Sequence, residues 1–556
     1  MTVHTVWFEP AAEGKTYAEA ADISLQFMFG WWEHPIYKGD YPPVMRKRIN
    51  YLSAQQNFTK SRLPYFTKDE IKLIKGTADF LGLSHYTSFL CSALDSGAVQ
   101  TLDSGAVQSP LMNPDTNVTC YQPSRSFLCS ALDSGAVQSP LMNPDTNVTC
   151  YQPSSWKTGA STWMKVTPWG FRKILNWIKK VYDNPKVLVT ENGYSDKGEL
   201  QDCNRVNFLN DYLTELLNAI KKDGCNVQGY AVWSLMDNFE WRSGHTERFG
   251  LYYVNFSDPN RARIPKTSAY VLTNIIKTRK IDTTFTPQGF KACPASCCVK
   301  GNGYEYPENL RDPYSFPDNF LFGVTTSAYQ IEGAWDVDGK GESIWDRLVH
   351  TRSNLIIDRM NGDIACNSYD KMREDIQLLQ YLGVNSYRFS LSWSRLLPGG
   401  HANYINPKGV RYYNELIDAL QENHIITIVT LFHWDLPQTL QEIGGWPNPV
   451  LADIFTDYAD IAFKEFGNRV KYWIIFSGLT LRYLTSQKAP AYNQDGIAGY
   501  MCGHTVIMGH AKAYRLYEEK YKTDQGGKIG MAVYAIWAES ETGCIDDKTA
   551  ADDYPS

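Results

Sequence analysis

The sequence contains no run of 18 consecutive apolar residues, the length that a membrane-spanning helix requires. Its formal charge of -6 is spread along the chain, without the basic block that would favour nucleic acid or an anionic membrane surface. Its twelve cysteines include no Cys-x-x-Cys pair, so a zinc ribbon or a thioredoxin-like site is not expected. The sequence therefore argues against a membrane or a nucleic acid as a partner, and it implies no metal or organic cofactor.

A signal peptide is also missing at the start of the chain, where residues 1–8 predict a strand. The 556 residues, 43% of them hydrophobic, are enough for one large core or two domains. Aromatic residues make up 13% of the chain. Their flat apolar faces suit both the core of a large barrel and a sugar-binding cleft.

Two sets of residues point to covalent modification. Cys293, Cys297 and Cys298 lie close together, and we expect disulfides or free thiols in a linker there, in preference to a metal site. Asn-x-Ser/Thr sequons, which carry glycans only if the chain is secreted, begin at Asn57, Asn117, Asn147 and Asn255.

Short apolar runs alternate with amphipathic stretches along the chain, the pattern of a parallel α/β protein. The predicted strands are 2–10, 78–86, 187–190, 229–235, 320–326, 386–391, 427–433 and 472–476. The predicted helices include 16–32, 168–182, 207–222, 369–382 and 410–422. Eight strand–helix units predict a closed (β/α)8 TIM barrel, in which catalytic groups lie where strands end.

The strand at 187–190 ends in Thr190-Glu-Asn-Gly193 and delivers one carboxylate at its C-terminal end. Glu191 is therefore the candidate nucleophile. Alone, such a tetrapeptide is more often an ordinary turn, so its assignment depends on the surrounding motifs.

Two irregularities disturb the barrel pattern. A ninth strand, residues 529–539, resembles residues 1–9, so two segments compete for one place in the barrel. Between 89 and 154, Leu-Asp-Ser-Gly-Ala-Val-Gln occurs three times, and residues 109–124 recur at 139–154. These repeats are too polar to bury a core of their own, and we expect a solvated loop enlarged by duplication.

Several long motifs at the predicted strand ends resemble glycoside hydrolase family 1, the β-glucosidase and myrosinase family, and especially its insect members. The motifs are FLFGVTTSAYQIEG at 320–333, YRFSLSWSR at 387–395, HWDLP at 433–437, TENG at 190–193 and WSLMDNFEW at 233–241. The resemblance covers nearly the whole chain. It implies a TIM barrel and a small-molecule glycoside as substrate, and the family is typically secreted; the oligomeric state stays undefined.

The two halves of the family barrel stand in exchanged order in this chain. Residues 1–279 resemble the C-terminal half, strands five to eight, and 319–556 resemble strands one to four plus a truncated second strand five. Residues 280–318, rich in Pro, Gly and Asn, are the expected linker, because the last strand of a closed barrel lies beside the first. The chain is thus a circular permutant or a chimera of two neighbouring genes. We expect the amino-terminal copy of strand five to occupy the barrel.

The resemblance also implies the chemistry, which is retaining hydrolysis by two carboxylates about 5 Å apart. One carboxylate attacks the anomeric carbon and the other protonates the leaving oxygen. Glu191 matches the family nucleophile. Arg388 matches the arginine that holds the nucleophile ionised, and Tyr86 matches the tyrosine that hydrogen-bonds it.

The sugar-binding positions of the family are matched by five further residues. Gln330, His433, Glu240 and Trp241 match residues that bind hydroxyls, and Trp233 matches the aromatic platform beneath the ring. Such a set suits a pyranose, which offers a rim of hydroxyls and an apolar C–H face.

One motif departs from the family. Where strand four carries Thr-Phe-Asn-Glu-Pro in the family, residues 475–479 are Ile-Phe-Ser-Gly-Leu. Gly478 replaces the acid/base glutamate, Ser477 its neighbouring asparagine, and Ser84 the matching asparagine of strand six. Plant myrosinases resemble this chain, because they carry glutamine in place of the acid/base glutamate and the aglycone of their substrate leaves without being protonated. Glu9, beside the gap, is a conceivable substitute acid.

Three hypotheses follow from this departure. The first is a retaining β-glycosidase impaired by the loss of its acid/base, and the second is a non-catalytic glycoside-binding pseudoenzyme. The third is a chimera of gene assembly with no stable product, which a continuous transcript across 280–318 would exclude. The sequence does not define the sugar, the aglycone or the disulfide pairing.

Overall fold

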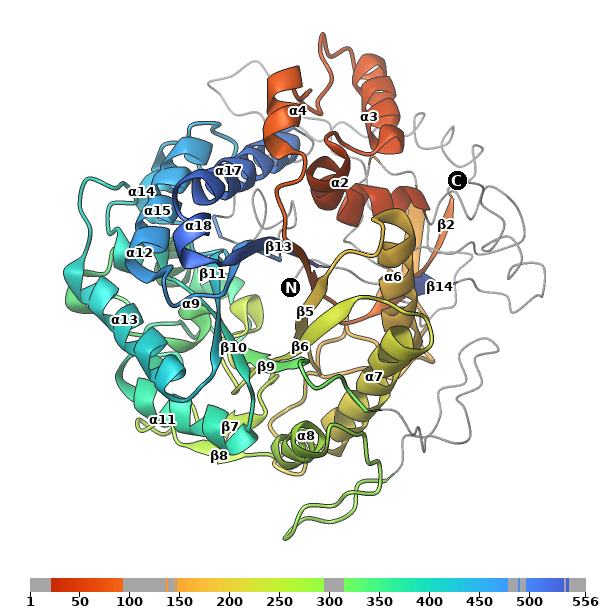
Figure 1. Ribbon diagram of the computed structural model, residues 1–556, viewed down its shortest axis with the longest axis vertical. Helices are drawn as coiled ribbons and strands as arrows, with labels where there is room; N and C mark the ends of the chain where they lie inside the picture. The colour runs from red at the N-terminus through yellow and green to blue at the C-terminus, as the bar shows by residue number, and fades with distance from the viewer. Residues whose placement is uncertain are drawn as a thin grey trace.

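Eight parallel strands close into a barrel in the order β1-β13-β12-β11-β10-β9-β6-β5, with helices around it (Figure 1). This computed structural model describes residues 22–93, 137–138, 145, 148–294, 315–478, 489–490, 497–534 and 537–539. The barrel strands are β1 Phe80–Ser84, β5 Val187–Asn192, β6 Val227–Trp233, β9 Leu321–Thr325, β10 Ser386–Ser390, β11 Ile426–Phe432, β12 Tyr472–Ser477 and β13 Lys528–Tyr534. The predicted TIM barrel is confirmed.

The strands are short apolar runs because both of their faces are covered. β1, β5, β9 and β10 are buried along their whole length. Six barrel strands each contribute one buried side chain to a hydrophobic cluster: Phe80, Leu188, Leu321, Ile428, Ile474 and Ala532. A barrel filled by side chains in this way is a packed core, so a site is expected at the C-terminal ends of the strands.

The helices surround the barrel, and local sequence signals fix several of their starts. α6 and α13 begin with proline at the first turn, and α10 begins with a capping box of Ser343 and Asp346. The α-helices are α2 Trp31–Lys38, α3 Pro43–Gln55, α4 Lys68–Ile74, α6 Pro168–Val181, α7 Cys203–Lys221, α8 Thr267–Thr278, α9 Ala328–Ile331, α10 Ile344–Thr351, α11 Ser368–Leu382, α12 Trp393–Leu396, α13 Pro407–Glu422, α14 Gln438–Glu442, α15 Leu451–Phe466, α17 Ala498–Lys520 and α18 Lys522–Gln525. Shorter helical turns are η1 Gln26–Gly30, η3 Trp241–Ser243, η4 Val337–Gly339 and η5 Ser353–Leu355. No helix in these described ranges is long and apolar enough to cross a bilayer.

Four of the predicted helices correspond to α6, α7, α11 and α13. The helix predicted at 16–32 is helical from 22 and continues through η1 and α2 to Lys38, while residues 16–21 lie outside the described residues.

The barrel is completed by the carboxyl-terminal copy of the duplicated strand. β13 lies between β12 and β1, with Trp473 opposite Ile529 and Leu81 opposite Met531. The prediction that residues 1–9 fill this place is therefore wrong. β13 continues directly from β12 through α17, and this local strand–helix–strand connection returns the chain to the neighbouring position. Residues 1–9, including Glu9, lie outside the described residues.

The early and late parts of the chain meet at two seams, the parallel strand pairs of β1 with β13 and of β6 with β9. β6 pairs with β9 from Gly229 opposite Leu321 to Trp233 opposite Thr325. In Figure 1, α6 and α7 lie opposite α13 and α15 across the barrel. Segments far apart in sequence thus complete one ring.

The duplicated insertion contributes strands, so the expected loop over 89–154 is wrong at both of its ends. β2 Ser88–Ala93, β3 Val137–Gln138, β4 Val148–Gln152 and β14 Trp537–Glu539 form one sheet in the order β14-β2-β4-β3. This sheet continues the chain beyond β1 and β13. Residues 94–136 lie outside the described residues. The remaining two strands, β7 Tyr252–Val254 and β8 Arg263–Pro265, form a separate hairpin.

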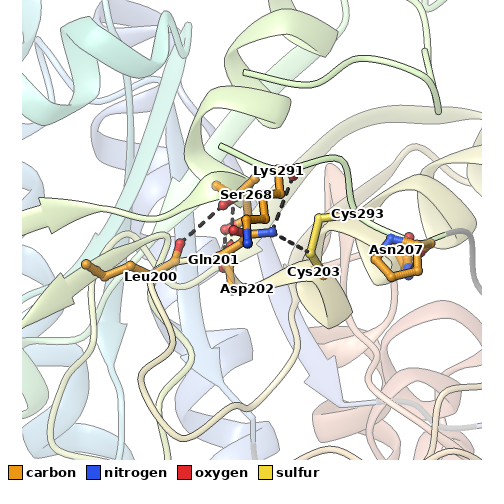
Figure 2. Close-up of a disulfide and its surroundings, with 10 residues drawn as sticks. Leu200, Gln201, Asp202, Cys203, Asn207, Ser268, Lys291 and Cys293 are labelled. Atoms are coloured by element: carbon orange, nitrogen blue, oxygen red, sulfur yellow. Dashed lines mark hydrogen bonds between the residues drawn. A yellow bond between two sulfur atoms is a disulfide. The ribbon is translucent and has the colours of Figure 1, made fainter. Parts of the chain in front are cut away.

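A disulfide joins Cys203 at the start of α7 to Cys293 (Figure 2), with a Cα–Cα distance of 5.2 Å. Hydrogen bonds from Gln201 to the Lys291 carbonyl and from Asn207 to the Pro294 carbonyl support the same segment. The expected disulfide chemistry is confirmed for Cys293, while Cys297 and Cys298 lie outside the described residues.

Substitution of one buried valine tests which copy fills the barrel. Val533 on β13 is only 2% exposed. We expect Val533→Asp to destabilise the protein by about 3 kcal/mol or more, because a buried carboxyl group there has no partner. Val3→Asp, the same change in the amino-terminal copy, should leave the thermal unfolding midpoint unchanged. A larger loss for Val3→Asp would assign the place to residues 1–9.

Candidate active site

Glu191 lies at the C-terminal end of β5, where the barrel opens, and is nearly buried. Arg388 Nη1 donates to Glu191 Oε1 at 2.7 Å, and Tyr86 Oη donates to Glu191 Oε2 at 3.1 Å. Ser477 Oγ lies 3.3 Å from Glu191 Oε1. The structure thus brings together the predicted nucleophile and both of the residues expected to support it.

Arg388, on β10, holds this arrangement rigid. Its Nε donates to Thr430 Oγ1 at 3.0 Å, and its Nη2 donates to Ser477 Oγ at 2.6 Å. Nη1 also donates to the Thr190 carbonyl at 3.2 Å. A guanidinium that is 1% exposed is expensive to bury unless it is paired and hydrogen-bonded, and here both conditions are met.

Tyr86 stays a neutral hydrogen-bond donor. Its burial, together with the adjacent Glu191 carboxylate, holds the pKa of Tyr86 well above its usual value. Its ring stacks on Tyr534 of β13 with a centroid distance of 5.2 Å. β13 therefore helps to position a side chain that touches the predicted nucleophile.

The predicted hydroxyl-binding residues Gln330 and Glu240 meet across the seam between β6 and β9. Gln330, on α9, donates through Nε2 to Asn238 Oδ1 at 2.9 Å, and Nε2 lies 3.4 Å from Glu240 Oε2. Ser327 Oγ donates to Gln330 Oε1 at 2.6 Å. The loop after β6 and the start of the segment after β9 thus build one polar cluster.

Burial raises the pKa of Glu240 to about 8, and the negative charges of Glu247 and Glu191 act in the same direction. Glu240 is therefore largely protonated at neutral pH. A protonated carboxyl group can donate as well as accept a hydrogen bond.

The remaining predicted residues form an aromatic wall. His433, just after β11, lies 6.1 Å from both Trp233 and Trp241, measured between ring centroids. Burial, and then the positive charge of Arg388, hold the pKa of His433 well below its usual value, so the imidazole is neutral. Its Nδ1 is buried without a hydrogen-bond partner in the described part of the chain.

The departure at strand four lies next to Glu191. Gly478 follows β12 with a φ of +57°, and a Cβ added there would lie 3.0 Å from the Trp434 ring. Trp434 itself donates to the Ser477 carbonyl at 3.0 Å. Ser84, the other asparagine position, shares a hydrogen bond of 3.1 Å with Thr190. β12 therefore brings a serine and a glycine to the rim where the family resemblance calls for a carboxyl group.

Sequence reasoning missed two supporting residues, Thr430 and Asn238. Thr430 is a polar residue inside the apolar run of β11, and Asn238 lies within the motif at 233–241. Both features are visible in the sequence and could have identified these residues. Within the described residues, no group of three His, Cys, Asp or Glu side chains could hold a metal ion.

Comparison with known proteins gives one family. The chain matches Glycosyl hydrolase family 1 over residues 1–281 and 313–555. It is 37% identical over 586 residues to human lactase/phlorizin hydrolase, covering 99% of this chain and 28% of that protein. It is 48% identical over 237 residues to Myrosinase 1 of Brevicoryne brassicae, covering 42% of this chain and 51% of that protein. The chain thus spans about a quarter to a half of the length of these relatives.

Among solved structures, an aphid myrosinase is 50% identical with a TM-score of 0.38, covering 39% of this chain and 48% of that one. A rice β-glucosidase, Os3BGlu6, is 38% identical with a TM-score of 0.40, covering 43% and 52%.

The raised pKa of Glu240 predicts a pH dependence of stability. Between pH 4.5 and 8 the unfolded chain releases this proton while the folded chain keeps it, so stability falls as the pH rises, by up to about 1.4 kcal/mol per pH unit. Glu240→Gln removes this contribution, and its unfolding midpoint should fall less than that of the wild type between pH 5 and pH 8. The exposed Glu422→Gln variant is the control. Parallel curves for Glu240→Gln and the wild type would contradict the assignment.

Proposed function

Because the chain belongs to glycosyl hydrolase family 1, we propose that it is a retaining β-glycosidase that acts on O- or S-glycosides through a covalent glycosyl-enzyme. The contact that best supports this is the buried ion pair of Glu191 with Arg388, 2.7 Å long, at the open end of the barrel. It keeps a carboxylate fixed at the position where a nucleophile is required.

In this proposal Glu191 attacks the anomeric carbon from one face of the sugar. Arg388 and Tyr86 fix the orientation of the carboxylate, and both hydrogen bonds are already formed in the free protein. Little reorganisation is then needed when the glycosyl ester forms.

The sugar itself is bound by the polar cluster and the aromatic wall. Gln330 and Glu240 offer an amide and a carboxyl group to neighbouring hydroxyls, and His433 Nδ1 offers a neutral imidazole nitrogen. Trp233 supplies the apolar face on which a pyranose ring can stack, and Trp241 adds its indole N–H.

The step that limits the proposed reaction is protonation of the leaving group. With Gly478 in place of a carboxyl group, nothing at this position protonates the departing oxygen, which costs roughly 10²–10⁴-fold in rate for an ordinary alkyl glycoside. A substrate whose aglycone leaves unaided, such as an activated aryl glycoside or an S-glycoside with a stable leaving group, avoids this loss. The same substitution supports the alternative of a non-catalytic glycoside-binding protein.

We also propose that the halves of the family barrel are exchanged in this chain. Residues 1–279 supply strands six to eight, 280–318 form the linker, and 319–556 supply strands one to four together with strand five, which is β13. The two separate family matches, before 282 and after 312, support this division. So does the pairing of β6 with β9, which joins the end of one part to the start of the other.

Turnover of an activated aryl β-glucoside tests the proposed activity. Azide needs no base to act as a nucleophile, so it should speed the release of the glycosyl group and yield a glycosyl azide. We expect turnover that rises with azide and is lost in Glu191→Gln. Binding of the glycoside without any turnover, with or without azide, would favour the binding protein.

Replacement of Gly478 tests the cause of the limitation. We expect Gly478→Glu to raise kcat/KM for alkyl glucosides by about 10²-fold or more, while leaving activated substrates little changed. Both Gly478→Glu and the control Gly478→Gln should lose about 1 kcal/mol of stability or more, because φ is +57° and the Trp434 ring is close. Equal rates for the two variants would show that the missing acid is not the limitation.

A further inference from the structure

The insertion between β1 and α6 is two copies of one sequence unit. Residues 88–100 recur letter for letter at 126–138, and residues 109–124 recur at 139–154. Each copy therefore has a first half and a second half of known sequence. Because each half has the same sequence in both copies, although residues 101–108 separate the halves of the first copy, the sequence of the halves alone does not decide which of them pair.

Each copy carries one cysteine in each half. Cys91 and Cys120 belong to the first copy, and Cys129 and Cys150 belong to the second. Pairing within copies would join Cys91 to Cys120 and Cys129 to Cys150. The outer halves of the insertion are the first half of the first copy and the second half of the second copy. Pairing between them would join Cys91 to Cys150.

The structure pairs the outer halves. β2, from the first copy, is antiparallel to β4, from the second copy, and the register sets Cys91 directly opposite Cys150. Opposed residues of antiparallel strands have Cα atoms about 4.5–5.5 Å apart, which lies within the range of disulfides.

Side chains of two second-copy residues, Gln152 and Asp145, bind this copy to other parts of the fold. Gln152, which ends β4, donates through Nε2 to Thr87 Oγ1 at 2.9 Å and to the Ser88 carbonyl at 3.0 Å. Asp145 accepts two hydrogen bonds from Arg62, of 2.8 and 2.9 Å, and one of 2.6 Å from Tyr500. These contacts join the second copy to the start of β2 and to α17.

Loop closure favours the same choice. Pairing β2 with residues 148–152 closes one loop, and the chain then leads directly to Lys165, whose backbone N–H donates to Thr87 Oγ1 at 2.9 Å. Pairing β2 with the identical residues 118–122 would require a second loop before the chain reached Lys165. The entropy of a second closure is an additional cost, whereas lengthening a single loop costs little.

We propose that Cys91 and Cys150 form a disulfide that closes the base of the duplicated insertion. The bond between Cys203 and Cys293 shows that the fold already accommodates one disulfide. Two thiols lose two protons and two electrons when the bond forms, and glutathione disulfide accepts them to give two molecules of glutathione. The bond fixes β2 to β4 immediately after Tyr86, at the rim of the barrel.

Trypsin separates the two copies, because Arg125 is the last residue of the first one. Cleavage after Lys75, Arg125 and Lys157 gives peptides 76–125 and 126–157, each with two of the four cysteines. The full-length protein, folded with a glutathione redox couple, is treated with N-ethylmaleimide and digested without reduction. Mass spectrometry should find the two peptides cross-linked, and reduction should separate them. Two uncross-linked peptides, each with an internal disulfide, would overturn the proposal.

A double variant identifies the pair. In Cys120→Ser/Cys129→Ser only Cys91 and Cys150 remain in the two peptides, and the cross-link should persist. In Cys91→Ser/Cys150→Ser the unfolding midpoint should fall, whereas Cys120→Ser/Cys129→Ser should keep the wild-type midpoint. Alkylation of both Cys91 and Cys150 in the first variant would refute the assignment.

Discussion

A closed barrel leaves no strand edge unpaired, and this requirement governs how the chain is arranged. Eight strands must form a ring, whatever their order in the sequence. β6 pairs with β9 and β1 pairs with β13, so both strand pairs join the early part of the chain to the late part. The candidate site depends on the same closure, because Glu191 comes from β5 and Arg388 from β10.

Within the site, burial sets the chemical state of each group. Glu191 forms an ion pair with Arg388, which makes three further hydrogen bonds. Glu240 and His433 lie nearby without such a partner, and burial favours their neutral forms. One charged carboxylate is thus surrounded by neutral donors and acceptors, an arrangement suited to a nucleophile facing a neutral sugar.

Much of the fold and the grouping of the site could be predicted from the sequence. The apolar runs of the barrel strands, the proline that begins α6, and the motifs around Glu191 and Gln330 are local signals. The occupant of the fifth position could not be predicted, because residues 1–9 and 529–539 carry similar local patterns and only the connection through α17 distinguishes them. The strands β2 and β4 were missed because their short sequences, SFLCSA and VTCYQ, lie within a longer polar, turn-rich insertion and gain their sheet partners from tertiary packing. The roles assigned to the site residues remain predictions.

The disulfide at Cys203 holds residue 293 on α7, and beyond it the two parts of the molecule meet through strand pairing and side-chain packing. The barrel therefore does not need an uninterrupted backbone between β6 and β9. Two separately translated polypeptides, divided after this anchor, would present complementary open edges to one another. The part of the chain before the linker and the part after it therefore pack together as two subunits of a heterodimer would, although here they belong to one polypeptide.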